Sequence, residues 1–150
     1  MTSLRRSIGV LTLMLAAATP AFAQEQSPAG RIKVVSGAAF IVRGNDTIPA
    51  RPGDPVFAAD GLRTSEGGSV GVTLKDDTRL SLGSNSEVRL DRYVYAPGSG
   101  GIGMVLKFVR GVAAYVSGRM AKLAPDSIRL ETPAAIVGIR GTTLALRVEP

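Results

Sequence analysis

The sequence predicts an all-β protein: a single compact domain of short strands that follows a cleaved signal peptide. Three observations predict this class: apolar residues that alternate with polar ones, turn residues at short intervals, and a basic, apolar, then small-residue pattern at the N-terminus. An alternating stripe cannot form one face of a helix, because helical neighbours lie three or four residues apart. The pattern leaves open whether the strands form a sandwich or barrel or stack as a β-solenoid.

Residues 1–23 have the organisation of a signal peptide. Arg5 and Arg6 precede an apolar run over residues 8–18, and Ala21 and Ala23 supply the small residues that a signal peptidase recognises. That run has 11 residues, whereas spanning a bilayer as a helix takes about 20. We expect cleavage after Ala23, a periplasmic location and no transmembrane helix in the mature chain. The absence of Cys excludes a lipoprotein anchor.

The mature chain is expected to hold a disordered lead-in over residues 24–29 and one domain over residues 30–150. Its first residues are polar, small and interrupted by Pro28, which is typical of an unfolded terminus. Without Arg5 and Arg6, 16 basic and 12 acidic side chains remain, a net charge of +4. These charges are spread singly along the chain, so we expect no nucleic-acid partner.

Strands are expected wherever the alternation is regular, and turn chemistry separates them. The alternating residues are Ile32 and Val34; Phe40 and Val42; Val70, Val72 and Leu74; Leu80 and Leu82; Val88 and Leu90; Ile102, Met104, Leu106 and Phe108; Val112, Ala114 and Val116; Ile128 and Leu130; Leu144, Leu146 and Val148. Only residues 118–124 suggest a helix. The chain stops directly after a strand pattern, which predicts an open edge that a continuing chain, a partner or the first strand would cover.

The composition argues against an enzyme. His and Cys are both absent, which removes the commonest general base, the thiol nucleophile and the commonest transition-metal ligands. The stretch from Gly98 to Gly103 matches G-x-G-x-x-G, but an alternating segment follows it where a dinucleotide site needs a helix. Asp76, Asp77 and Asp91 are interpreted as turn and surface residues. We therefore expect no catalytic residue, no cofactor and no metal site.

Five short motifs, in order, resemble the FecR family. They are Gly30-Arg31-Ile32-Lys33-Val34-Val35-Ser36-Gly37; Gly53-Asp54-Pro55-Val56 with Asp60-Gly61-Leu62-Arg63-Thr64; the segment from Ser69 to Leu80; Ser84-Asn85-Ser86-Glu87-Val88; and Thr132-Pro133-Ala134-Ala135-Ile136-Val137-Gly138-Ile139-Arg140-Gly141-Thr142. The resemblance runs from about Gly30 to Val148. At the central hairpin this chain has Asp77 where an Asp-Gly turn is usual.

The family is named for a periplasmic regulator that partners an outer-membrane transporter and controls a sigma factor, and the resemblance implies its fold and its compartment for this chain. Signalling members carry a cytoplasmic segment and a membrane helix ahead of the domain, and this chain has a signal peptide there instead. The signature positions, expected to be structural, are Gly53, Asp54, Asp60, Leu62, Arg63, Thr64, Ser86, Thr132, Pro133, Gly138, Arg140, Gly141 and Thr142. Arg140 is the charged residue of an apolar segment, so we expect its guanidinium to hold carbonyls or a carboxylate.

The function expected from these features is that of a non-catalytic binding or regulatory module that engages an envelope protein. Tyr93 and Tyr95 share one strand face and are candidate partner-binding residues, although packing in the core or at an edge is the commoner role of such half-buried tyrosines. Two alternatives stay open: a structural or surface-interaction protein, and a sensor of an anionic small ligand such as a ferric chelate.

Overall fold

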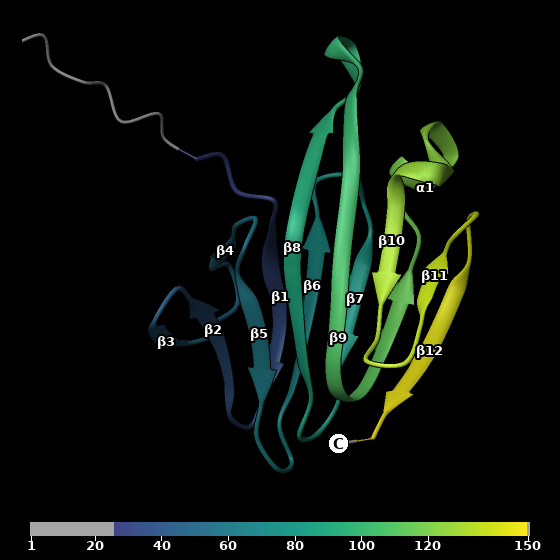
Figure 1. Cartoon of the computed structure of the whole chain (residues 1–150). Coiled ribbons are helices and arrows are strands. Elements are labelled where there is room, and N and C mark those ends of the chain that lie inside the picture. Colours follow the sequence, from purple (N-terminus) through teal and green to yellow (C-terminus); the bar gives the residue numbers. More distant parts are fainter. Residues whose placement is uncertain (1–25, 150) are drawn as a thin grey trace, which may run out of the picture.

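The computed structural model describes residues 26–149, and these form one curled sheet (Figure 1). Twelve strands belong to the sheet, and the helical pieces are short, which confirms the all-β expectation. The first six strands are β1 (Gly30–Ser36), β2 (Ala39–Arg43), β3 (Asp46–Pro49), β4 (Pro55–Val56), β5 (Gly61–Thr64) and β6 (Ser69–Leu74). The others are β7 (Arg79–Leu82), β8 (Glu87–Ala96), β9 (Gly101–Val116), β10 (Ile128–Glu131), β11 (Ile136–Gly138) and β12 (Thr143–Val148).

Strand β9 organises the molecule. Its first part pairs with β8 on one edge and, in parallel, with β10 on the other. Its last part pairs with β7 and with β12, both antiparallel. One strand of 16 residues therefore belongs to two wings of the sheet. The bend between them lies at Gly111, whose φ of +85° favours glycine.

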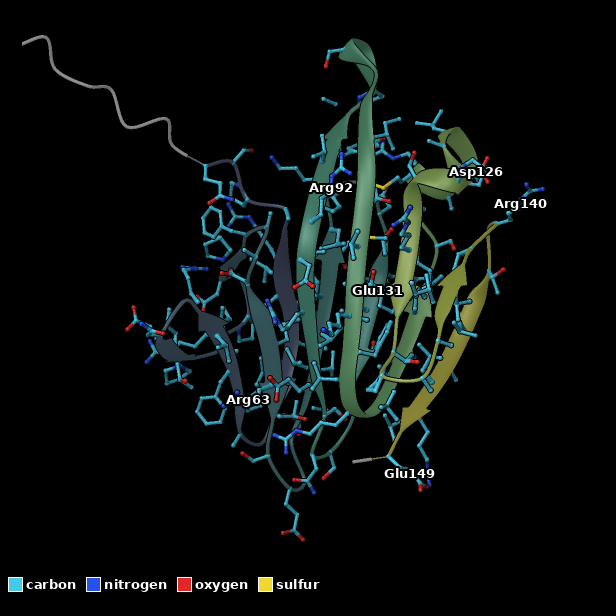
Figure 2. The ribbon with its side chains drawn as sticks, in the orientation of Figure 1. Arg63, Arg92, Asp126, Glu131, Arg140 and Glu149 are labelled. Atoms are coloured by element: carbon cyan, nitrogen blue, oxygen red, sulfur yellow. The ribbon has the colours of Figure 1, made fainter. Side chains whose placement is uncertain are left out.

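The two wings curl toward each other into a half-barrel rather than a solenoid. The strand order is β3-β2-β5-β8-β9-β7-β6-β1-β4, and β10, β11 and β12 join on the other edge of β9. The first strand pairs with β6 and β4, so it does not cover the edge of β12. Side chains on the inward faces meet in one core, while Arg63 and Glu131 lie on the outward face (Figure 2).

Buried and exposed residues alternate along the strands as expected, but in three places the residues that face the core differ from those expected. A register shift between Ile32 and Val34 turns Val34 outward, where it is 60% exposed. In β2 the buried residues are Ala39 and Ile41, not the expected Phe40 and Val42. After the bend at Gly111 the phase reverses, so that Tyr115 is fully buried and Val112 is 41% exposed. Bulges and bends move side chains between faces, and alternation alone does not locate them.

The ends of the described region bear on two further expectations. Ala29, the last residue of the expected lead-in, is buried, and its N–H donates to Val56 O at 2.7 Å. The expected helix is present as α1 (Met120–Leu123), which the 3₁₀ turn η2 (Pro125–Ser127) follows, and a second 3₁₀ turn, η1 (Pro97–Ser99), joins β8 to β9. The expected signal peptide lies outside the described residues. No helix within residues 26–149 has the length and apolarity to cross a membrane.

Candidate functional site

The first cluster of signature residues holds β5 against the bend of β9. Thr64 and Ser86 are both buried, and Thr64 Oγ1 donates to Gly83 O at 2.6 Å and accepts from Ser86 N at 2.9 Å. Ser86 Oγ accepts from Val112 N at 2.8 Å and lies 3.0 Å from Val112 O. A Cβ at Gly111 would lie 2.3 Å from Ser86 Oγ. These residues therefore fix the bend, and Leu62 is buried beside them.

The signature residues of the turns before β5 are also structural. Asp54 accepts from Arg51 N at 2.9 Å, which closes the turn where Gly53 adopts a φ of +93°. Arg63, half-exposed, forms an ion pair with Glu87, with 3.3 Å between Nε and Oε2. Arg110 reaches the same carboxylate at 3.5 Å. The pairs lie on the outward face, so they orient neighbouring strands more than they stabilise the fold.

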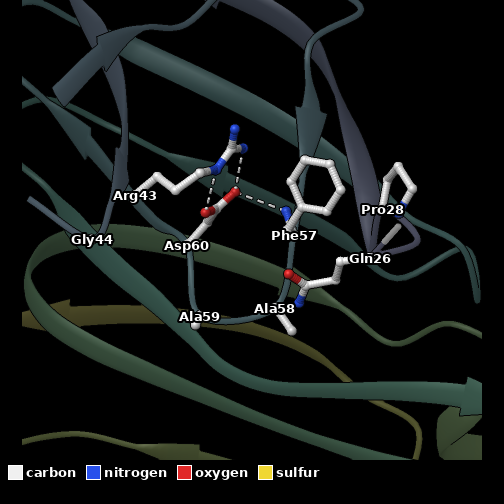
Figure 3. A pocket seen from close by; sticks show the side chains of 8 residues that line it. All are labelled: Gln26, Pro28, Arg43, Gly44, Phe57, Ala58, Ala59 and Asp60. Carbon is white, nitrogen blue, oxygen red and sulfur yellow. Dashed lines mark hydrogen bonds and ion pairs between the residues drawn. The ribbon is translucent and has the colours of Figure 1, made fainter. Parts of the chain in front are cut away.

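An open groove lies beside Asp60 (Figure 3). Asp60 is 2% exposed, and its carboxylate accepts two hydrogen bonds from Arg43, at 2.9 Å from Nε and 2.7 Å from Nη2. It also accepts from Phe57 N at 2.8 Å. The hydrogen bond to Asp60 raises the pKa of Arg43. The Arg43 guanidinium lies 4.6 Å from the centre of the Phe57 ring, in the range of a cation–π contact.

This groove combines one ion pair with mainly apolar lining residues. Its volume is about 650 Å³, and its lining carries no Ser, Thr, Lys or Tyr. The charge of Arg43 is balanced by Asp60 at short range, so an anionic ligand gains little here. Ala59 adopts a φ of +72° in the loop that forms the floor, a conformation that costs a non-glycine residue about 1 kcal/mol or more. The residues lining it are Gln26, Pro28, Arg43, Gly44, Phe57, Ala58, Ala59 and Asp60.

The second cluster of signature residues, from Thr132 to Thr142, lies at the surface. Thr132 Oγ1 accepts from Ala135 N at 3.1 Å and so closes the β10–β11 turn, where Pro133 needs no donor. Thr142 N donates to Ser117 Oγ at 2.9 Å. Gly141 has a φ of +60°, whereas Gly138 has neither a positive φ nor a neighbour within 4 Å of a built Cβ.

Arg140 differs from the expectation of an anchored guanidinium. Its side chain is 83% exposed, and its contact is a 3.6 Å approach of Nη2 to the equally exposed Asp126. The chain turns outward at Gly141, which carries the side chain away from the sheet. The structure therefore revises the structural role expected for Arg140.

Tyr93 and Tyr95 lie on β8 near its end, and Tyr93 is engaged inside the protein. Its hydroxyl lies 3.0 Å from Asp76 Oδ1 and accepts from Asp76 N, also at 3.0 Å. Burial, followed by the nearby Asp76 charge, raises the pKa of Tyr93. Tyr95 lies under the Arg119 guanidinium at 5.7 Å. Both tyrosines are partly buried against the core, and a partner-binding role for them stays a prediction.

Asp76 is a structural centre that the sequence reasoning missed. It is fully buried, and its carboxylate accepts from Thr78 Oγ1 at 2.6 Å and from Met120 N at 3.3 Å, besides Tyr93. These bonds join the β6–β7 turn to β8 and to the start of α1. Asp77 adopts a φ of +67°, the conformation of the glycine it replaces. The signal in the sequence was the pair Asp76-Asp77, because a turn of this kind needs only one such residue.

No three Asp or Glu side chains gather into a possible metal site among residues 26–149. Asp91 instead pairs with Arg89 at 3.1 Å. The described residues thus offer grooves, strand edges and exposed side chains as functional surfaces.

Comparison with known proteins places the chain in a family. The sequence model of the FecR protein family matches residues 60–150. The match begins at the buried Asp60 and covers both signature clusters, from Thr64 and Ser86 to Arg140, whereas the motifs at residues 30–37 and 53–56 fall before it. No curated protein and no solved structure matches the chain significantly. Because the family match covers more than half of its length, the chain belongs to the FecR family.

Proposed function

We propose that this protein is an exported periplasmic module of FecR type, non-catalytic, that engages a protein partner of the cell envelope. Membership of a regulatory family supports the general role, and the signal-peptide pattern supports the compartment. The observation that carries the proposal is the outer edge of β12, which has no partner strand among residues 26–149.

The edge of β12 differs from the free edges of β3 and β4 at the ends of the strand order. Strand β3 ends at Pro49 and β4 starts at Pro55 with two residues, and proline and short length both discourage a further strand. Strand β12 has six residues with neither proline nor a register shift. Three apolar side chains of β12 are only partly buried against the core, and an added strand would cover them: Leu144, Leu146 and Val148.

The ladder between β9 and β12 shows which backbone groups are free. Ser117 N donates to Thr142 O at 3.1 Å, so the backbone groups of Thr142 point toward β9. Along an antiparallel strand, successive residues point their backbone N–H and C=O groups alternately toward the neighbouring strand and away from it. The N–H of Ala145 therefore points to the open edge. An extended segment of a partner can pair there, as peptides do with sheet edges in other proteins.

The test is affinity capture from envelope extract with two matched variants. Ala145→Pro removes an outward N–H and adds a ring at the edge without removing a ladder hydrogen bond. Ala145→Thr keeps the N–H and suits a strand, so it serves as the control. We expect the wild type and Ala145→Thr to capture the same envelope protein, and Ala145→Pro to capture less than a tenth as much. Equal capture by all three folded proteins would refute the edge as the binding surface.

The two alternatives have their own outcomes. A longer assembly of this chain with itself, detected by light scattering, would favour a structural protein. Thermal stabilisation by ferric chelates or other small anions, with no envelope protein captured, would favour a ligand sensor.

A further inference from the structure

The segment over residues 136–142 contains features that its own fold does not use. Ile136 is 69% exposed, the highest value among the exposed large apolar residues of the described chain. Gly138 would accept a Cβ without contact within 4 Å, and its φ does not demand glycine. Exposed apolar surface and an unneeded glycine are typical of places where another chain approaches the backbone closely.

This segment borders a groove of about 510 Å³ beside η2. The apolar part of the groove is formed by Ile128, Ile136 and Ile139, and its charged rim by Arg129, Arg140 and Asp126. Arg129 has no ion pair among the described residues, and Asp126 lies 3.6 Å from Arg140. The rim therefore carries one positive charge more than it balances.

The surroundings of the rim leave that excess in place. Arg129 and Gly138 are cross-strand partners, so the side chain of Arg129 lies next to a residue that has no side chain. The nearest acid along β10 is Glu131, which lies opposite Ile136 of β11 on one side and opposite Lys107 of β9 on the other, so the charge of Lys107 offsets that of Glu131 in the sum over this surface. In Figure 2 Asp126 and Arg140 lie together at one corner, and Glu131 lies farther down the outward face.

We propose that this groove binds an extended, acidic segment of the protein partner, with an apolar side chain on Ile136 and carboxylates on Arg129 and Arg140. The inference rests on the proposed function and names the chemistry of the partner. The free edge of β11, which pairs only with β10, supplies backbone groups for an extended chain. Guanidinium groups suit carboxylates because they donate in a planar fork.

An extended peptide fits these features better than a small free anion. A small anion would use Arg129 and Arg140 but would leave Ile136 exposed and Gly138 without a role. A peptide uses all four, because a backbone can lie over the glycine while alternate side chains reach the apolar and the charged positions.

The test uses a phage-displayed library of random 12-residue peptides, panned on the mature chain. We expect enrichment of peptides that alternate apolar and acidic residues. The best peptide, made synthetically, should lose at least about tenfold in affinity for Arg129→Glu/Arg140→Glu. The control is Lys33→Glu/Arg79→Glu, which changes the net charge equally at two exposed positions of β1 and β7. This control should bind the peptide within about twofold of wild type.

The outcomes separate this inference from the proposed function. Equal loss in both charge-reversal variants, enrichment of basic peptides, or no enrichment would overturn the groove as an acidic-peptide site. None of these results touches capture at the β12 edge, which is measured with envelope protein and the Ala145 variants. Failure of capture by the wild type would instead refute the function itself.

Discussion

Replacing Gly111 by Ala should destabilise the domain strongly, because Gly111 makes the bend that joins the two wings. A non-glycine residue at its φ of +85° costs roughly 1–2 kcal/mol. The new Cβ would lie 2.5 Å from Ser86 Cα and 2.6 Å from Asn85 O, and such overpacking costs about 1–3 kcal/mol more. The free energy of unfolding should therefore fall by about 2–5 kcal/mol.

Urea denaturation followed by circular dichroism measures this change, with Gly138→Ala as the matched control. Gly138 has no positive φ and open space around it, so Gly138→Ala should leave stability unchanged or raise it by about 0.5 kcal/mol. In a domain of this size the loss at Gly111 corresponds to a Tm lower by about 6–15 °C. A loss below about 1 kcal/mol for Gly111→Ala would refute the bend as a strained, tightly packed corner.

Three further predictions concern charged and buried groups. Arg43→Ala should lower the free energy of unfolding by about 2–3 kcal/mol, because it leaves the Asp60 carboxylate, 2% exposed, without its cation. In a double-mutant cycle measured by denaturant unfolding, Arg43→Ala/Asp60→Ala should cost less than the sum of the two single variants. Arg140→Ala should change the unfolding free energy by less than about 0.5 kcal/mol in the same assay, since the side chain is 83% exposed. Tyr93→Phe should reduce the loss of stability at alkaline pH, read as Tm against pH, because the folded state raises the pKa of Tyr93.

The sign of the pH effect follows from linkage. A phenol whose pKa is raised on folding contributes its full stability below the unfolded pKa of about 10, and that contribution is lost as the pH rises above it. Burial also raises the pKa of Tyr115, so some alkaline loss should persist in the variant. Three results would contradict these predictions: additive effects at Arg43 and Asp60, a Tm clearly lowered by Arg140→Ala, and identical alkaline profiles for Tyr93→Phe and wild type.

The alternation of buried and exposed side chains could be predicted from the sequence, because it follows from the local geometry of a strand. Strands such as β6 and β7 alternate strictly, and their apolar residues are buried where the pattern places them. Which residues face the core could not be predicted where the backbone departs from regular strand geometry. The register shift after Ile32 and the bend at Gly111 each reverse the face of the residues that follow, and both depend on contacts with distant strands.

The candidate sites depend still more on long-range contacts. Arg43 and Asp60 are 17 residues apart and meet only because β2 pairs with β5. Asp76 reads as a turn residue in sequence, and its burial follows from the packing of α1 and β8 over that turn. The family motif around Arg140 was visible as a pattern, but its exposure required the path of the chain past Gly141.

The measurement that tests the central proposal most directly is hydrogen exchange of the purified domain with and without its captured envelope protein. The account predicts added protection of the outward amides of β12, those of Thr143, Ala145 and Arg147, because a partner strand would pair with them. Protection that spares β12 and appears only around the Arg43 groove, or no change anywhere, would contradict engagement of a partner at this edge.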